Sequence, residues 1–304
     1  MSLIFKMLNL QLMLFALIII GIIVKKIGII TTQNRKSFSN LLINVVLPCN
    51  IVNSFMGSLD ISSDFITNCI MAVVLSAIIQ LSATYGSKLL FKRFPRQKQN
   101  VMSYGMICSN SSFIGLPVAA ELYGDLGVLY TSIFQIPVRF TMWTAGLSLF
   151  TRVDKKSALK KLAKHPCIIA IFIGFVVMLV PFSMPQVITN TVSSVSKCTT
   201  PLSMFVIGSI LADADVKTLF SKDILYFTFL RLLGFPLIIW LILQPFGLDP
   251  LLVNICVIMS GMPAGSTTSI LADQYGCDSM FASQITFVST LFSIVTIPLL
   301  GMLF

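Results

Sequence analysis

The most constraining feature of this sequence is a succession of apolar runs, each about as long as a membrane-crossing helix. A helix needs about 20 mostly apolar residues to span the hydrocarbon core of a bilayer. Only 11% of the residues are charged, against about 25% in soluble domains, so a water-soluble enzyme or binding module is excluded. The sequence therefore predicts an all-α polytopic membrane protein with ten transmembrane helices. The ten runs are 7–24, 38–56, 65–90, 101–120, 126–150, 166–182, 187–211, 224–243, 251–272 and 280–300.

The basic residues predict the orientation of these helices. Lys and Arg gather in the cytoplasmic loops of membrane proteins. Here 17 of the 21 Lys and Arg lie in the first, third, fifth and seventh connections, and the even-numbered connections hold none. We therefore expect a multi-pass protein of the cytoplasmic membrane of the cell, with both termini outside. These loops account for the net charge of +10 and can also contact anionic lipid, so no nucleic acid partner is needed.

Two landmarks recur along the chain at a nearly constant offset. Gln274–Gly276 resembles Leu122–Gly124 at an offset of 152, and Thr200-Pro201 matches Leu47-Pro48 at an offset of 153. Each half then has five runs, and because five is odd the second half must enter the membrane from the opposite side. Inverted repeats of this kind recur in secondary transporters. The expected parts are a first five-helix repeat (1–150), a basic cytosolic linker (151–165) and a second, inverted five-helix repeat (166–304).

The fourth and ninth runs carry polar interruptions at corresponding places. Cys108–Pro117 and Met259–Thr268 each combine Gly, Pro and small polar residues within apolar surroundings. Proline and glycine disturb or loosen helical backbone, and unwound backbone is stable in a membrane only where it lines a cavity or is buried in protein. We expect broken helices that form the substrate site, the alternative being two kinked helices whose Ser and Thr bond their own backbone. The candidate residues are Ser109, Asn110, Ser111, Ser112, Pro117, Pro263, Ala264, Gly265, Ser266 and Thr267.

Three basic residues fall well inside the apolar runs, away from their ends, and no carboxylate falls in the middle of any run. Arg139 and Lys197 lie near the middle of their runs, and Arg231 lies nearer the cytosolic end. A cation at the centre of a membrane helix costs about 2.5–3.5 kcal/mol, and a bound carboxylate would supply the missing charge. We therefore add Arg139 and Lys197 to the candidate substrate residues. The alternatives for these cations are snorkelling to the interface and pairing with backbone carbonyls that the helix breaks free. Asn44 joins them because it corresponds to Lys197 in the repeat and a following proline frees its carbonyl.

The interrupted segments resemble the auxin efflux carrier family, including its bacterial malate/malonate-permease-like members. The resemblance is carried by Ser109–Pro117 and Met262–Gly276, and Leu47-Pro48 and His165-Pro166 are also similar to that family. It covers the whole chain.

This resemblance implies ten helices in two inverted repeats, divided into a scaffold domain and a transport domain with crossed broken helices 4 and 9. It also implies elevator-type alternating access and an organic anion as substrate. By position, Asn110 and its neighbours would form the first crossover and residues 263–267 the second. The chain departs from the family at Gly265-Ser266, where an Asn-containing stretch is common.

Together these observations predict a secondary transporter for a small organic anion, a mono- or dicarboxylate. No cofactor or resident metal is expected, and the coupling ion is either Na⁺ or H⁺ or there is none; a homodimer is also considered. The alternatives are a sodium-coupled bile-acid-type organic anion symporter and a membrane sensor that binds a ligand without moving it. An enzyme is not expected, because no Walker loop, HExxH or G-x-S-x-G motif occurs. The single histidine, His165, is interpreted as a helix cap.

Overall fold

The protein is all-helical in the part of the chain that the computed structural model describes, which has no β-strand. Ser266 and most of the basic linker lie outside the described residues. Five helical stretches are long and apolar enough to cross a membrane, and shorter apolar helices accompany them. The described residues are 3–56, 63–151, 160, 163–179, 184–213, 221–265 and 267–303. The five long stretches are Arg35–Phe55, Phe65–Leu90, Ser111–Leu149, Lys222–Phe246 and Ser279–Gly301.

Most helices follow the predicted apolar runs, and short π-helical or 3-10 turns join some of them. The helix over 116–141 continues from the fourth run into the fifth, with non-helical backbone at Gly124 (φ 60°). In the first half they are α1 (Leu3–Lys26), α2 (Arg35–Leu41), η1 (Leu42–Val46), α3 (Leu47–Phe55), α4 (Ser63–Leu90), α5 (Arg96–Ile107), η2 (Ser111–Gly115), α6 (Leu116–Thr141), η3 (Met142–Gly146) and η4 (Leu147–Leu149). In the second half they are α8 (Pro166–Leu179), α9 (Gln186–Ser196), α10 (Thr199–Leu211), α11 (Lys222–Phe229), η6 (Leu230–Gly234), α12 (Phe235–Leu243), η7 (Gln244–Phe246), α13 (Pro250–Ser260), α14 (Thr267–Gln274) and α15 (Ser279–Gly301).

Proline explains where several of these helices widen. The π-helical turns η1, η2 and η6 each run directly into a helix whose second residue is a proline, namely Pro48, Pro117 and Pro236. A proline has no N–H for the carbonyl four residues before it, and its ring clashes with that carbonyl. The backbone accommodates this by adding one residue to the turn, which is how π-bulges arise within α-helices.

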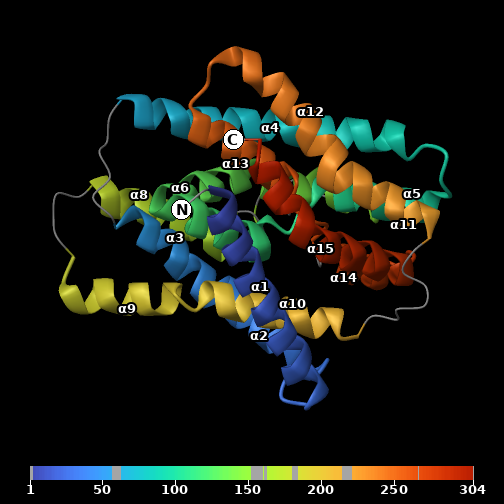
Figure 1. Cartoon of the computed structure of the whole chain (residues 1–304), viewed down its shortest axis with the longest axis horizontal. Coiled ribbons are helices and arrows are strands. Elements are labelled where there is room, and N and C mark those ends of the chain that lie inside the picture. The colour runs from blue at the N-terminus through green and yellow to red at the C-terminus, as the bar shows by residue number, and fades with distance from the viewer. Residues whose placement is uncertain are drawn as a thin grey trace.

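The helices form two groups that are distinguished by their contacts. In the first group α1 and α2 pack on α10, α3 packs on α8 and α9, and η1 contacts both α3 and α10. In the second group α4 packs on α5 and α6, while α15 packs on α11 and α14. Figure 1 shows α4 along one side of the molecule and α9 and α10 along the opposite side. The two groups meet where α3 contacts α6, where α1 contacts α15 and where α10 contacts η2.

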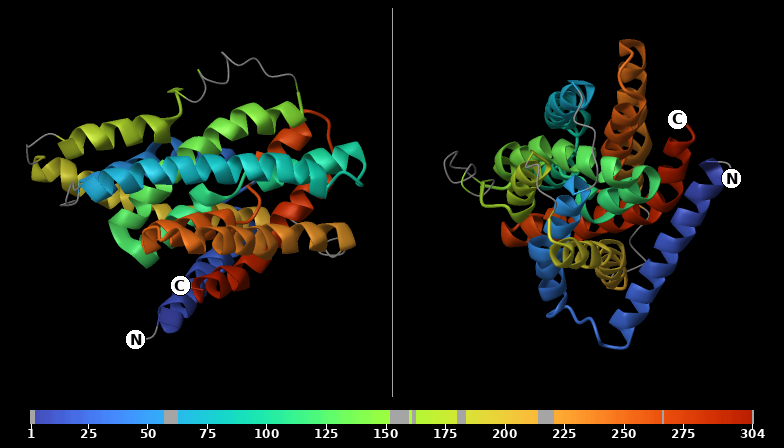
Figure 2. Two further views of the ribbon diagram at one scale, coloured as in Figure 1. Left: turned by 90° about the horizontal axis from the view of Figure 1, so that it is seen from above. Right: turned by 90° about the vertical axis from the view of Figure 1, so that its left-hand side faces the viewer.

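The two ends of the chain lie close together. The start of α1 and the end of α15 lie on the same side of the molecule in both views of Figure 2. These two helices also contact each other.

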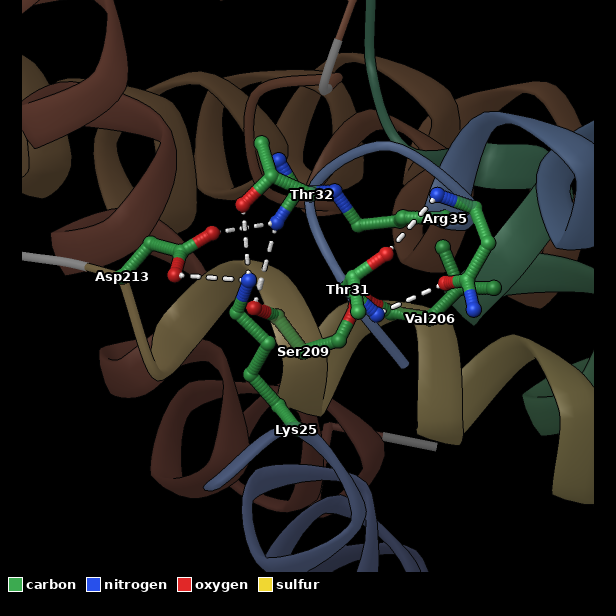
Figure 3. A network of polar contacts seen from close by, with 8 residues as sticks. Lys25, Thr31, Thr32, Arg35, Val206, Ser209 and Asp213 are labelled. Atoms are coloured by element: carbon green, nitrogen blue, oxygen red, sulfur yellow. Dashed lines mark hydrogen bonds and ion pairs between the residues drawn. The ribbon is translucent and has the colours of Figure 1, made fainter. Parts of the chain in front are cut away.

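A polar network fastens the turn after α1 to the end of α10 (Figure 3). Asp213 accepts a hydrogen bond from Arg35 Nη1 at 2.7 Å and lies 3.2 Å from Lys25 Nζ. Arg35 Nη1 also donates to the carbonyl oxygen of Ser209 at 3.2 Å. A cation at a helix C-terminus interacts favourably with the negative end of the helix dipole. The network therefore holds the end of α10 against the end of α1 and the start of α2.

Glycines allow α1 and α10 to approach each other closely. A Cβ at Gly208 would overlap the carbonyl oxygen of Ile18 and lie 2.9 Å from the Cα of Gly21. Small residues at helix crossings permit this backbone approach in membrane proteins.

Gly208→Ala is expected to destabilise the protein by about 1–3 kcal/mol, because the added methyl group must push α1 and α10 apart. The measurement is thermal unfolding of the purified protein in detergent. Gly86→Ala in α4 is the control, since a Cβ at Gly86 would meet nothing within 4 Å. Equal melting temperatures for the wild type and Gly208→Ala would contradict the close α1–α10 crossing.

Candidate functional site

The helical structure stops and resumes within both polar interruptions that the sequence contains. In the first interruption, α5 ends at Ile107 and helical structure resumes at Ser111. In the second, α13 ends at Ser260 and α14 begins at Thr267. Each interruption leaves backbone groups without the partners that an unbroken helix would give them.

The two interruptions supply hydrogen-bond partners to each other. The N–H of Asn110 donates to the carbonyl of Pro263 at 2.8 Å, and the N–H of Gly265 donates to the carbonyl of Cys108 at 2.8 Å. Between these bonds lies an isolated antiparallel bridge. We call this contact the paired breaks. It satisfies polar backbone that would otherwise be costly to bury.

Glycine at position 265 allows the paired breaks to come together. A Cβ on Gly265 would lie 3.2 Å from the carbonyl oxygen of Cys108 and 3.5 Å from that of Ser109. Because both neighbours are backbone atoms, a larger residue would have to push the two segments apart.

A cavity of about 170 Å³ lies beside the paired breaks. It is smaller than the pockets of about 300–1,000 Å³ that hold drug-sized ligands, so its size favours a small ligand. Its wall combines residues from both groups of helices, among them Ser39 and His165 from the first group and Gln135 from the second. The sequence-predicted residues that line it are Ser109, Asn110, Ser111, Ser112, Arg139, Gly265 and Thr267.

Arg139 places a buried cation on the cavity wall. Its side chain is 9% exposed. Nη2 donates to Gln135 Oε1 at 2.7 Å and to Ser112 Oγ at 3.2 Å, and Nη1 lies 3.0 Å from His165 Nε2. Nε is buried and has no hydrogen-bond partner among the described residues. Among the residues that the structure describes, no Asp, Glu or second Lys or Arg lines the cavity, so Arg139 has only neutral partners there.

His165 contacts Arg139 as a neutral imidazole. A guanidinium only donates hydrogen bonds, so Nε2 of His165 must accept from Arg139. The backbone N–H of Cys167 lies 3.3 Å from Nδ1, but a neutral imidazole accepts at one nitrogen only, and the shorter contact with a charged donor favours Nε2. His165 directly precedes α8, outside the helix. Burial and the nearby Arg139 charge lower the pKa of His165 to about 3.

Further donors face the same cavity. Ser111, Ser112 and Phe113, at the start of η2, line it, and the first N–H groups of a helix have no intrahelical acceptor and carry partial positive charge. Asn110 is 8% exposed, and within the described residues no hydrogen bond occupies its side-chain amide. The cavity is therefore rich in donors and electropositive.

Two predicted residues lie away from the cavity because of how their helices are built. The seventh apolar run is two helices, and Lys197 occupies the turn between α9 and α10, where its side chain is exposed. Asn44 is exposed on η1, and its amide donates to the carbonyl of Asn40 at 2.8 Å. Exposed lysines can extend their ammonium group to water or headgroups. The structure does not bring Lys197 and Asn44 to the group around Arg139.

The remaining predicted residues belong to the breaks or the helix that follows them. Pro117 is buried in the first turn of α6, and Pro263 and Ala264 are buried in the second break. Pro263 takes part through its carbonyl oxygen, and the N–H of Ala264 donates to Ser289 Oγ at 3.2 Å. Ser266 lies outside the described residues.

Sequence reasoning missed Gln135 and assigned His165 only a capping role. Gln135 lies four residues before Arg139, a spacing that puts both side chains on one helix face, so this neighbour could have been found. His165 is 26 residues from Arg139, and only the folded chain brings them together.

Comparison with known proteins identifies the class of molecule that has this architecture. The family described as "Membrane transport protein" matches residues 7–160 and 150–300. An uncharacterized transporter of Methanocaldococcus jannaschii is 23% identical over 298 residues, which cover 95% of this chain and 96% of the relative. A Rhizobium meliloti protein named "Putative malonate transporter" is 21% identical over 238 residues, or 75% of this chain and 74% of the relative. An uncharacterized transporter of Escherichia coli is 24% identical over 280 residues, 88% of each chain.

The contact between Arg139 and His165 generates a prediction about pH. The unfolded chain binds a proton at His165 near pH 6.5, whereas the folded chain does so only near pH 3, so acidification through this range favours unfolding. The melting temperature should therefore fall as the pH is lowered from 6.5. His165→Gln should weaken this dependence, because glutamine can accept from Arg139 and does not titrate. Identical pH profiles for the two proteins would contradict the neutral His165–Arg139 contact.

Proposed function

The chain belongs to the membrane transport protein family, the auxin efflux carriers that its motifs resemble, and we propose that it moves a small organic anion across the cytoplasmic membrane. Its relatives are named as transporters and not as enzymes, which agrees with the prediction from the sequence. The observation that carries the proposal is Arg139, a buried guanidinium on the wall of a small cavity where no described residue supplies a carboxylate.

The donors on the cavity wall suit a carboxylate. A carboxylate only accepts hydrogen bonds, and those from charged donors are the stronger ones. Arg139, the Asn110 amide and the N–H groups at the start of η2 lie on the same wall. A mono- or dicarboxylate would thus find a countercharge and several donors in one place.

The size of the cavity supports a substrate of few atoms. At about 170 Å³ it is too small for a steroid-sized anion, so the bile-acid type of substrate fits less well. The name of the Rhizobium meliloti relative refers to malonate, a dicarboxylate of three carbons. Malonate is therefore the first substrate to test.

The proposed mechanism is elevator-type alternating access with the site at the crossing of broken helices 4 and 9. The paired breaks and the position of the cavity between the two groups of helices support it. Asn110, Arg139 and Gly265 come from the second group, while Ser39 and His165 come from the first. Movement of the second group against the first would carry the anion with it. This proposal includes ten transmembrane helices in two inverted repeats and both termini outside.

Arg139→Gln is expected to weaken binding of malonate about tenfold to a hundredfold, because a hydrogen bond to a charged group contributes about 1.5–3 kcal/mol. The measurement is the shift of the melting temperature of the purified protein with malonate concentration, followed by uptake of labelled malonate into proteoliposomes. Lys197→Gln in parallel should have a smaller effect, since Lys197 is exposed outside the cavity.

Two results would contradict the proposed site. One is a folded Arg139→Gln protein that binds and transports the anion as the wild type does. The other is the loss of binding in Lys197→Gln alone, which would move the site to the turn between α9 and α10.

A further inference from the structure

Arg231 is a second buried arginine, and it joins the two broken helices. It lies in η6 and is 2% exposed. Its Nε donates to the carbonyl oxygen of Met262 at 2.8 Å, and its Nη1 donates to the carbonyl oxygen of Met106 at 2.9 Å. One guanidinium therefore holds one carbonyl from each of the paired breaks. It is not among the residues that line the cavity.

Both carbonyls are free because the helices break. Met106 is the last residue but one of α5, and in an unbroken helix its carbonyl would accept the N–H of Asn110. That N–H donates to Pro263 instead. Met262 lies just after the end of α13 at Ser260, where an unbroken helix would have continued.

The charge around Arg231 is negative, although no carboxylate of the described residues supplies it. The C-terminal end of a helix carries a partial negative charge equivalent to about half an elementary charge, and the ends of α5 and α13 converge on this one side chain. The ion pairs of the described residues do not include Arg231. The hydrogen-bond acceptors around the Arg231 guanidinium are thus backbone carbonyls at two helix ends.

This is the environment in which secondary transporters hold a coupling cation. In transporters with broken helices, unwound carbonyls and the C-terminal ends of half-helices coordinate Na⁺. Arg231 presents a positive charge to the same kind of ligand, and a guanidinium stays charged at all physiological pH values. It is covalently fixed, so it cannot leave during a transport cycle.

We propose that Arg231 is a built-in cation that takes the place of a coupling Na⁺ between the paired breaks, so that anion transport by this protein does not require sodium. The inference rests on the proposed function, because it assigns the coupling of that same transport site. Arg231 acts as a positioning residue: it sets the distance between the breaks while the opposite, N-terminal ends face the anion cavity.

The first experiment compares uptake of labelled malonate into proteoliposomes in NaCl, KCl and choline chloride. The proposal predicts rates for the wild type that agree within about twofold in the three salts. A loss of more than about tenfold when Na⁺ is replaced would overturn it.

The second experiment needs no substrate and measures melting temperature. Arg231→Ala leaves space for a cation, whereas Arg231→Met fills the space without a charge. We expect both variants to melt below the wild type, and millimolar guanidinium or Na⁺ to raise the melting temperature of Arg231→Ala but not that of Arg231→Met or the wild type. Equal responses of the two variants to these cations would overturn the proposal.

Arg231→Lys keeps the experiment decisive if the neutral variants do not fold. Lysine retains the charge with fewer donors, so this variant should remain folded and independent of Na⁺, and sodium-dependent stability in it would contradict the proposal. If no organic anion shifts the wild-type melting temperature or is taken up, the proposed function fails, whereas the melting comparison of the Arg231 variants still decides whether this side chain replaces a cation.

Discussion

Two backbone hydrogen bonds, from Asn110 to Pro263 and from Gly265 to Cys108, are the contact on which the rest of the structure depends. A membrane offers no water to unwound backbone, so a broken helix is stable only if protein groups replace the missing partners. Here each break supplies part of what the other lacks, and glycine at position 265 permits the close approach. The pairing also places the two kinds of helix end in different surroundings. The N-terminal ends face the cavity, whereas carbonyls at the C-terminal ends accept hydrogen bonds from Arg231.

Two buried arginines then have different roles because their surroundings differ. The N–H groups of Arg231 donate to one backbone carbonyl at each break. These carbonyls are fixed parts of the fold. Arg139 contacts neutral side chains, Gln135, Ser112 and His165, on the wall of the cavity. A buried charge with neutral partners is stabilised further by a counterion, and the cavity gives an anion access to it. The contact between Arg139 and His165 also links the two groups of helices across the site.

Much of this architecture could be predicted from the sequence, and the failures have physical reasons. Apolar runs, and Gly and Pro within polar stretches, are local signals, and they located most of the helices, the breaks and seven of the residues that line the cavity. Hydropathy indicates which residues lie in an apolar run, but not the direction in which a side chain faces. For this reason Lys197 is grouped with Arg139 on the sequence alone, although the Lys197 side chain is exposed. The turn that places it there lies in the polar stretch 193–200, which the sequence prediction includes in one continuous run. The partnership of His165 with Arg139, and of Arg231 with two carbonyls, depends on contacts between distant segments.

The most direct test of the anion site is a crystal structure of the protein with bromomalonate, in which the anomalous signal of bromine locates the ligand. The account predicts an anomalous peak in the cavity, with the carboxylates within hydrogen-bond distance of Arg139 and of the start of η2, and with the breaks still paired. A ligand bound elsewhere while the cavity stays empty would contradict the account. So would an unbroken helix through residues 107–111.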